Sequence, residues 1–187
     1  MADEIDITDE SLMGRICNGD HQAFEMLVNR YHQVLYSAAF RTCNDVDLSE
    51  DVVQEALLKL WKKPQSFDFR KGVKLSTWMY RVVVNLTLDK LRAKKRRGVW
   101  SDDTIDSISD DRMSAIEQMV MNERQELLEQ AIMKLPERQR VALNLCFFEG
   151  LSNKEAAYIL GVGVKAVESL LMRAKASLKN NLSPWKG

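Results

Sequence analysis

The chain has 187 residues, of which 45% are hydrophobic and 29% are charged, and its 27 Lys/Arg residues balance 27 Asp/Glu residues. A chain of this length can bury one or two hydrophobic cores, and no apolar run approaches the length that crosses a membrane. The acidic N-terminus lacks the apolar run of a secretory signal, so we expect a cytoplasmic protein. The cysteine count is odd, which favours reduced thiols over a disulfide framework.

A metal site would need His and Cys side chains at short, paired spacings. Cys17 and His21 are four residues apart, but His32 and Cys43 follow at longer intervals, and Cys146 is remote from them in the sequence. Structural roles fit these residues better than a metal site, which remains the weaker alternative. We expect no metal and no other cofactor.

Charge is distributed unevenly along the chain. Residues 1–69 carry six basic and thirteen acidic side chains, whereas residues 70–97 carry ten Lys/Arg and one acid, Asp89. Such a split predicts one surface for an anionic partner and another for a basic protein surface.

The N-terminal part of the chain predicts two helices before residue 45. The first is a short helix over Asp9 to Cys17, with apolar residues Leu12, Met13 and Ile16. Asp20 would cap a longer helix, whose apolar residues recur at helical spacing from Phe24 to Ala38.

A third helix is predicted over Leu48 to Lys62. Asp47 lies three residues before Glu50, which is a capping-box spacing with Asp in place of Ser or Thr. Pro64 would end this helix. Its apolar residues would face inward, and its exposed face would show Asp51, Gln54, Glu55 and Leu58.

The segment from Leu75 to Arg97 predicts a helix with two different faces. Ser76 would be its N-cap. The apolar stripe comprises Leu75, Trp78, Met79, Val82 and Leu86, and the polar face comprises Arg81, Asn85, Asp89, Arg92 and Arg96. Cations, an amide and nearby aromatic rings suit a nucleic-acid backbone with a base exposed beside it. A solvated basic helix end is the alternative, but a DNA-type element later in the chain favours nucleic acid.

Residues 98–114 contain five aspartates and little apolar periodicity, which predicts a flexible acidic linker. A plain tether is its simplest interpretation. The second domain would begin near Ala115 with a helix that runs to about Lys134. Pro136 suits the first turn of the next helix, and Gly150 would stop that helix.

A helix-turn-helix is predicted over residues 151–178. Ser152 and Glu155 form a capping box, and Gly161 lies at the turn between the two helices. The second helix would be supported by Val164, Val167, Leu171 and Leu178. In this motif the second helix enters the major groove of DNA.

Three stretches carry a resemblance to a known family. They are DVVQEALLKLWK at Asp51–Lys62, LSTWMYRVVVNLTLDKLRAKKRR at Leu75–Arg97, and the segment LPERQRVALNLCFFEGLSNKEAAYILGVGVKAVESLLMRAKASL at Leu135–Leu178. In this order and spacing they resemble the extracytoplasmic-function (ECF, group 4) sigma factors of the sigma-70 family, the smallest specificity subunits of bacterial RNA polymerase.

The resemblance implies an all-α fold of two small helical domains joined by the flexible acidic linker. A four-helix sigma region 2 would occupy residues 1–97, and a four-helix region 4 with the helix-turn-helix would occupy residues 115–187. The linker at residues 98–114 would thread toward the polymerase active site and RNA exit path, as it does in the family.

The resemblance also implies roles for named residues. The third helix would bind the coiled coil of the polymerase β′ subunit through Asp51, Gln54, Glu55, Leu58 and Trp61. The loop Phe67–Lys74 would capture a base flipped from the non-template strand. The opened −10 element would be bound by Phe67, Arg70, Lys74, Trp78, Tyr80, Arg81, Asn85, Lys94 and Arg96. The −35 duplex would be read by Lys165, Glu168, Ser169, Met172, Arg173 and Lys175.

A protein of this family is a transcription initiation factor and not an enzyme. Its implied partners are promoter DNA, core RNA polymerase through the β′ coiled coil and the β flap, and an anti-sigma factor, with no membrane insertion. Many relatives carry basic residues where this chain has Glu168 and Leu170. Because Glu accepts from cytosine whereas Arg prefers guanine, we expect a different preferred −35 sequence.

Two other classes of function stay open from the residues alone. An independent helix-turn-helix repressor or activator could use its first domain for dimerisation or ligand binding, but a duplex-only repressor has no use for a strand-opening surface. For an enzyme, the sequence shows no nucleophile elbow, P-loop, Glu-x-x-His pair or dinucleotide glycine motif.

Overall fold

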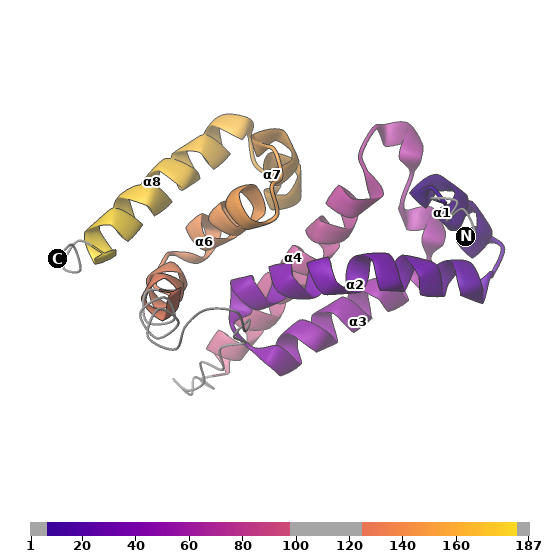
Figure 1. Cartoon of the computed structure of the whole chain (residues 1–187), viewed down its shortest axis with the longest axis horizontal. Coiled ribbons are helices and arrows are strands. Elements are labelled where there is room, and N and C mark those ends of the chain that lie inside the picture. The colour runs from indigo at the N-terminus through magenta and orange to yellow at the C-terminus, as the bar shows by residue number, and fades with distance from the viewer. Residues whose placement is uncertain (1–6, 98–124, 183–187) are drawn as a thin grey trace, which may run out of the picture. The chain divides into compact units, whose positions relative to one another are not determined.

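The computed structural model describes residues 7–97 and 125–182 (Figure 1). The chain divides into two compact units, and the division lies between Ala93 and Lys94. Within the described ranges every regular element is a helix, which confirms the predicted all-α fold. The predicted linker at residues 98–114, and the start of the helix predicted from Ala115, lie outside the described residues.

Three α-helices and most of a fourth make up the N-terminal unit. They are α1 (Asp9–Cys17), α2 (His21–Cys43), α3 (Val46–Lys62) and α4 (Leu75–Arg96), and the short 3₁₀ turns η1 (Pro64–Ser66) and η2 (Phe69–Lys71) connect α3 to α4. The helices α2 and α3 lie side by side, joined by a tight turn (Figure 1). The unit has an aliphatic core to which every helix contributes, for example Leu12, Leu35, Leu60 and Val83.

Polar side chains set the starts of the first three helices. Thr8 and Asp20 accept hydrogen bonds from backbone N–H groups in the first turns of α1 and α2, as the sequence predicts for Asp20. The predicted cap of α3 is wrong: Asp45, not Asp47, accepts from the Leu48 N–H at 3.0 Å. Asn44 adopts the left-handed backbone conformation and ends α2, and α3 begins two residues later, at Val46.

Two details of α4 differ from the predicted helix. It begins at Leu75, so Ser76 lies inside the first turn and is not the N-cap. Its core-facing side is also rotated, because Val83 and Val84 are buried, whereas Val82 and Leu86 are only half-buried. Three consecutive valines fit more than one helical stripe, and the fold buries Val83 and Val84 and leaves Val82 partly exposed.

The C-terminal unit contains a helix at residues 125–133, then α6 (Glu137–Leu143), α7 (Asn153–Leu160) and α8 (Val164–Leu182). Its core includes Ile132, Leu135, Leu143 and Ala174, with Leu178 packed against them. The buried Arg140 side chain donates from Nη1 to the Met133 carbonyl at 2.8 Å, which satisfies an acceptor at the end of the preceding helix. Pro136 precedes α6 as its N-cap and does not lie within the first turn.

The helix after Pro136 changes its winding before it ends. Residues Asn144–Phe148 form a π-helical segment, η3, in which the Glu149 N–H donates to the Asn144 carbonyl at 3.1 Å. Phe147 is 55% exposed, although both neighbouring α-helices are well packed. Gly150 adopts a positive φ of 64° and ends the segment, as predicted.

The cysteines have three different environments. Cys17 is exposed at the end of α1, Cys43 is buried with its Sγ 3.2 Å from the Ser49 Oγ, and Cys146 is half-buried. Burial raises the pKa of the Cys43 and Cys146 thiols. Among the described residues, no three His, Cys, Asp or Glu side chains cluster as a metal site would require. No helix in the same ranges has the length and apolarity needed to span a membrane.

Candidate functional site

The outer face of α3 is the first candidate surface. Asp51, Gln54 and Leu58 are exposed, and Leu58 shows 49% of its surface. Glu55 is half-buried. Trp61 is half-buried as well, and its ring lies 4.6 Å from the His21 ring, centroid to centroid. Trp61 therefore anchors the end of α3 to the start of α2 at the border of this surface.

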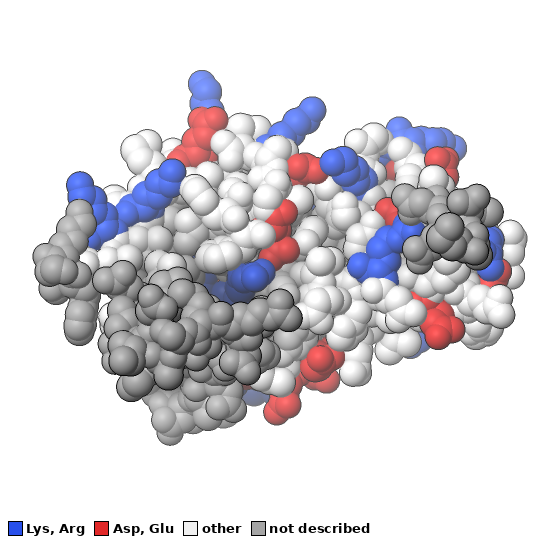
Figure 2. Space-filling model, in the orientation of Figure 1, with Lys and Arg blue, Asp and Glu red and all other residues white. Residues whose placement is uncertain are grey.

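The acidic side chains on α3 are paired with cations. Lys59 Nζ lies 2.9 Å from one Glu55 oxygen. Lys90, which comes from α4, lies 3.3 Å from the other Glu55 oxygen and 3.5 Å from Asp51. Hydrogen bonds from Lys59 and then Lys90 lower the pKa of Glu55. On the visible face of this unit, Figure 2 likewise shows Lys and Arg interspersed with Asp and Glu.

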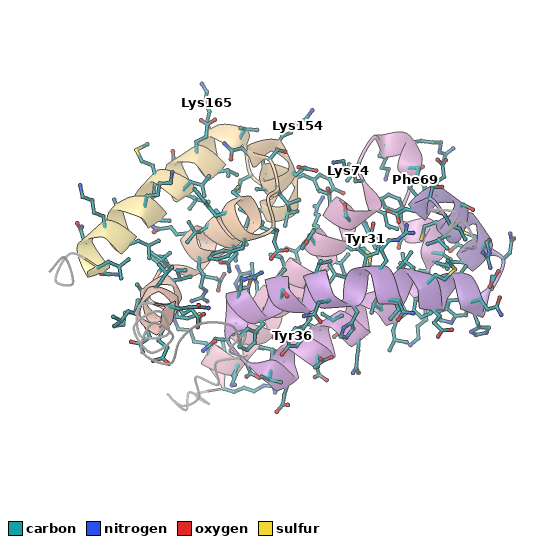
Figure 3. The ribbon with its side chains drawn as sticks, in the orientation of Figure 1. Tyr31, Tyr36, Phe69, Lys74, Lys154 and Lys165 are labelled. Carbon is teal, nitrogen blue, oxygen red and sulfur yellow. The ribbon has the colours of Figure 1, made fainter. Side chains whose placement is uncertain are left out.

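The loop before α4 is built around a small aromatic cluster. Phe67 is buried, with its ring centroid 4.6 Å from that of Phe69 and 5.7 Å from that of Trp78. Asp68 accepts from the Arg70 backbone N–H and also pairs with the Arg70 guanidinium at 2.9 Å. The same side-chain contact lowers the pKa of Asp68. Phe69 and Lys74 lie at either end of the turn that leads into α4 (Figure 3).

The polar face of α4 begins next to this loop. Arg81 and Asn85 stand one turn apart, half-buried and exposed respectively, and Lys94 and Arg96 are exposed at the far end. Tyr80 is buried and lies beneath the surface, as Phe67 does in the loop. The structure therefore brings Trp78, Arg81 and Asn85 to one side of α4 and uses the Tyr80 ring for packing.

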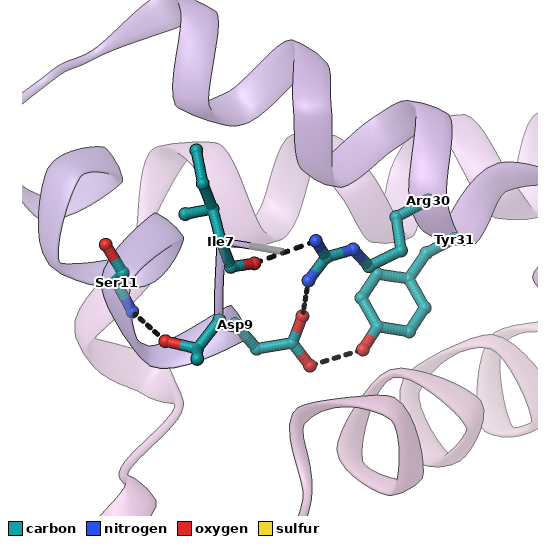
Figure 4. Close-up of polar contacts among 6 residues, drawn as sticks. Ile7, Asp9, Ser11, Arg30 and Tyr31 are labelled. Carbon is teal, nitrogen blue, oxygen red and sulfur yellow. Dashed lines mark hydrogen bonds and ion pairs between the residues drawn. The ribbon is translucent and has the colours of Figure 1, made fainter. Parts of the chain in front are cut away.

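A polar network attaches α1 to α2 (Figure 4). The Arg30 guanidinium donates to Asp9 at 2.7 Å and to the Ile7 carbonyl at 2.8 Å, and the Tyr31 hydroxyl donates to the second Asp9 oxygen. Burial, followed by the bond to Asp9, raises the pKa of Tyr31. Because α1 also lies against η1, this network supports the beginning of the loop. Its members are far apart in sequence, so helical periodicity gave no sign of it.

The helix-turn-helix has the local geometry that the sequence predicts. Ser152 Oγ accepts from the Glu155 N–H at 3.2 Å, and the Glu155 carboxylate accepts from the Ser152 N–H at 3.0 Å, which confirms the capping box. Gly161 has a φ of 65°, and the following Val162 N–H donates back to the Ala157 carbonyl at 3.0 Å. These bonds fix the tight turn between α7 and α8.

The second helix, α8, buries little of its own surface. Val167 and Ala174 are its buried residues, whereas Val164, which was expected to support the helix, is exposed. Its outer side shows Lys165, Glu168 and Met172 at intervals of three and four residues.

The remaining predicted readers on α8 differ in their surroundings. Arg173 is exposed and Ser169 is half-buried. Lys175 Nζ lies 4.8 Å from the centre of the Phe147 ring, so this cation packs on η3. Figure 3 shows Lys154 of α7 and Lys165 of α8 projecting on the same side of the C-terminal unit. Lys154 is a cation that the sequence analysis did not single out.

Comparison with known proteins gives matches over both units. Residues 27–97 match the family model for Sigma-70 region 2, and residues 125–178 match the model for Sigma-70 region 4. The sigma-H factor of Pseudomonas aeruginosa is 32% identical over 184 residues, which cover 94% of each chain. The ECF sigma-E factor of Escherichia coli is 33% identical over 186 residues, which cover 95% of this chain and 96% of that protein.

A solved structure extends the similarity to the fold. It is that of CnrH in complex with the cytosolic domain of CnrY, with 26% sequence identity and a TM-score of 0.67. The match covers 94% of this chain and 97% of that chain.

Proposed function

The chain belongs to the ECF RNA polymerase sigma factors, which are transcription initiation factors, and we propose that it directs core RNA polymerase to promoters through three separate surfaces. In this proposal residues 1–97 form region 2, residues 98–114 the linker and residues 115–187 region 4. The protein would act in the cytoplasm.

The first proposed surface is the outer face of α3, which would dock on the coiled coil of the polymerase β′ subunit. Leu58 offers an exposed apolar anchor, and Asp51 and Glu55 offer carboxylates to a basic partner helix. Gln54 and Trp61 complete the face. Region 4 would contact the β flap.

The second proposed surface opens the −10 element. Trp78, Arg81 and Asn85 follow one another on α4 at three- and four-residue spacing, and Trp78 contacts the Phe67–Lys74 loop through Phe67. Stacking and amide hydrogen bonds offset the cost of unstacking a base, which is a few kcal/mol. This arrangement is the observation that carries the proposal, because a duplex-binding repressor would have no use for it.

Around this centre, other side chains support the opened strand. Phe69, Arg70 and Lys74 would meet it from the loop, and the exposed Lys94 and Arg96 would hold phosphates. The buried rings of Phe67 and Tyr80 would position the loop and α4 from beneath.

The third proposed surface is the outer side of α8, which would read the −35 duplex. Glu168 and Arg173 would face base edges in the major groove, with Lys165, Ser169 and Met172 nearby on bases or phosphates. Lys175 is held over Phe147 and would reach only a flanking phosphate. Lys154 at the start of α7 would contact the backbone in the way that the first helix of this motif does.

We also infer regulation by an anti-sigma factor, which the family resemblance implies. The CnrH structure contains a bound protein partner, the cytosolic domain of CnrY. Stress or envelope promoters are the proposed targets.

The test is run-off transcription with purified core polymerase across genomic promoter fragments. We expect promoter-specific transcripts with the wild-type chain and none when Asp51→Lys and Glu55→Lys are combined, although that variant should keep its fold and its −35 duplex binding. A chain that binds duplex DNA but neither co-purifies with core polymerase nor yields transcripts would instead be an independent helix-turn-helix regulator.

A further inference from the structure

Lys90 belongs to the basic segment of α4 but does not lie on its DNA-facing side. Nine residues separate Arg81 from Lys90, which is about two and a half helical turns, so their side chains leave opposite sides of α4. Lys90 instead follows the buried Val83 and Thr87 by seven and three residues. Its side chain, 33% exposed, therefore emerges at the edge of the packed face.

At that edge Lys90 meets the two carboxylates of the α3 face. Its Nζ lies 3.3 Å from Glu55 and 3.5 Å from Asp51, which are one helical turn apart on α3. Lys59 also forms an ion pair with Glu55, so the carboxylates of Asp51 and Glu55 are paired with the ammonium groups of Lys59 and Lys90. The face that appears acidic in the sequence is therefore close to neutral in the folded protein.

We propose that Lys90 competes with a basic residue of core polymerase for Asp51 and Glu55. Its ion pairs with these carboxylates would thereby lower the affinity of the sigma factor for the polymerase. This inference rests on the proposed docking role of the α3 face. The ion pairs of Lys90 with Asp51 and Glu55 can be replaced because ion pairs at partly exposed positions are weak. A polymerase cation that also excludes water from the same carboxylates would interact with them more strongly.

The exchange would link the two working surfaces of region 2. Lys90 lies on α4, which carries Arg81 and Asn85, and its partners lie on α3. When a polymerase cation takes the carboxylates, Lys90 loses its ion pairs, and α4 keeps its apolar packing through Val83 and Val84. Docking therefore changes the charge around the DNA-opening helix without moving its core.

The experiment measures the affinity of full-length variants for core polymerase, by competition with fluorescently labelled wild-type protein. Lys90→Gln removes the charge, Lys90→Met removes it while keeping an apolar stem, and Lys90→Arg keeps it. At about 0.1 M salt we expect roughly twofold to fivefold tighter binding for the Gln and Met variants and no change for Arg. The gain should fade toward about 1 M salt, where charges are screened over a few ångströms.

A double-mutant cycle tests whether Lys90 acts through its two partners. In a chain with Asp51→Asn and Glu55→Gln, Lys90→Gln should give no gain in affinity. Lys62→Gln is the matched control, because Lys62 is an exposed cation at the end of α3 and its loss changes the net charge equally. The expected result for this control is less than half the gain seen with Lys90→Gln.

Three outcomes overturn the inference, and they are distinct from failure of the proposed function. Unchanged or weaker binding of both neutral Lys90 variants would contradict it, as would an equal gain from Lys62→Gln or a full gain in the Asn/Gln background. Failure of the docking proposal appears separately, as wild-type polymerase affinity in the Asp51→Asn, Glu55→Gln chain.

Discussion

The two helices proposed to meet DNA are supported in different ways. Eight side chains of α4 are buried, whereas α8 buries two, Val167 and Ala174. A helix that holds an opened strand has to stay in place while the base pairs separate, and broad packing gives α4 that rigidity. A helix that reads an intact duplex needs only a fixed turn before it and a few buried side chains. Most of its surface then stays available for contacts with DNA.

The largest expected effect comes from a charge placed among the buried residues of α4 or of α8. Val83 of α4 and Val167 of α8 are both fully buried, so Val83→Asp and Val167→Asp are a matched pair. Each should destabilise its own unit by about 4 kcal/mol or more, because a buried carboxylate lacks partners. Val83→Asp should abolish polymerase docking through α3 and spare −35 duplex binding, whereas Val167→Asp should abolish −35 duplex binding and keep the polymerase docking that α3 provides.

Urea denaturation followed by circular dichroism measures the stability of each variant. Separate assays of polymerase binding and −35 duplex binding show which function each variant loses. If either substitution abolished both kinds of binding, the units would not fold independently, and the contrast between α4 and α8 would lose its basis.

The next effect concerns the exposed amide on α4. Asn85→Ala should leave core binding and −35 binding intact but weaken promoter opening by roughly 1–3 kcal/mol, because the flipped base loses hydrogen bonds. Permanganate footprinting of unpaired thymines measures opening. A pre-melted −10 bubble is the control and should show a smaller defect. Equal opening by the variant and the wild type would limit Asn85 to a structural role.

On α8 a substitution should change preference and leave stability alone. Glu168→Arg should alter the preferred −35 sequence, with roughly 1–3 kcal/mol of discrimination at one base pair, and change the unfolding free energy by less than about 0.5 kcal/mol. Selection from a randomised −35 library gives the preference. Identical preferred sequences for both proteins would remove Glu168 from the base-reading set.

The smallest effect is expected at the capping box. Ser152→Ala removes the acceptor for the Glu155 N–H and should cost about 1 kcal/mol of region 4 stability. Ser152→Asp retains an acceptor and should behave as wild type. The unfolding midpoint of each variant measures this difference, and a midpoint for Ser152→Ala at the wild-type value would mean that Gly161 and the core alone hold α7.

Local rules explain which parts of the fold the sequence predicted. The caps at Asp20 and Ser152 and the turn at Gly161 involve residues within a few positions of each other, so their spacing carries the information. The cap of α3 was misplaced because two aspartates, Asp45 and Asp47, both satisfy the local rule and only the backbone after Asn44 distinguishes them.

Long-range contacts explain what the sequence could not predict. Lys90 and Asp51 are 39 residues apart, and the periodicity of neither helix predicts that they pair. The count of ten Lys/Arg in residues 70–97 did not separate Lys90 from the other cations, whereas the fold pairs Lys90 with Asp51 and Glu55 of α3. The proposed −10, −35 and polymerase residues come from family resemblance, and their roles stay predictions.

The three thiols give a means of attaching a single reporter group without altering the sequence. Cys17 is exposed at the end of α1, whereas Cys43 is buried and Cys146 is half-buried, and burial raises the pKa of both thiols. Because the thiolate is the reactive form, a maleimide dye at neutral pH should modify Cys17 first. A dye placed there would sit on α1, which Asp9, Arg30 and Tyr31 attach to α2.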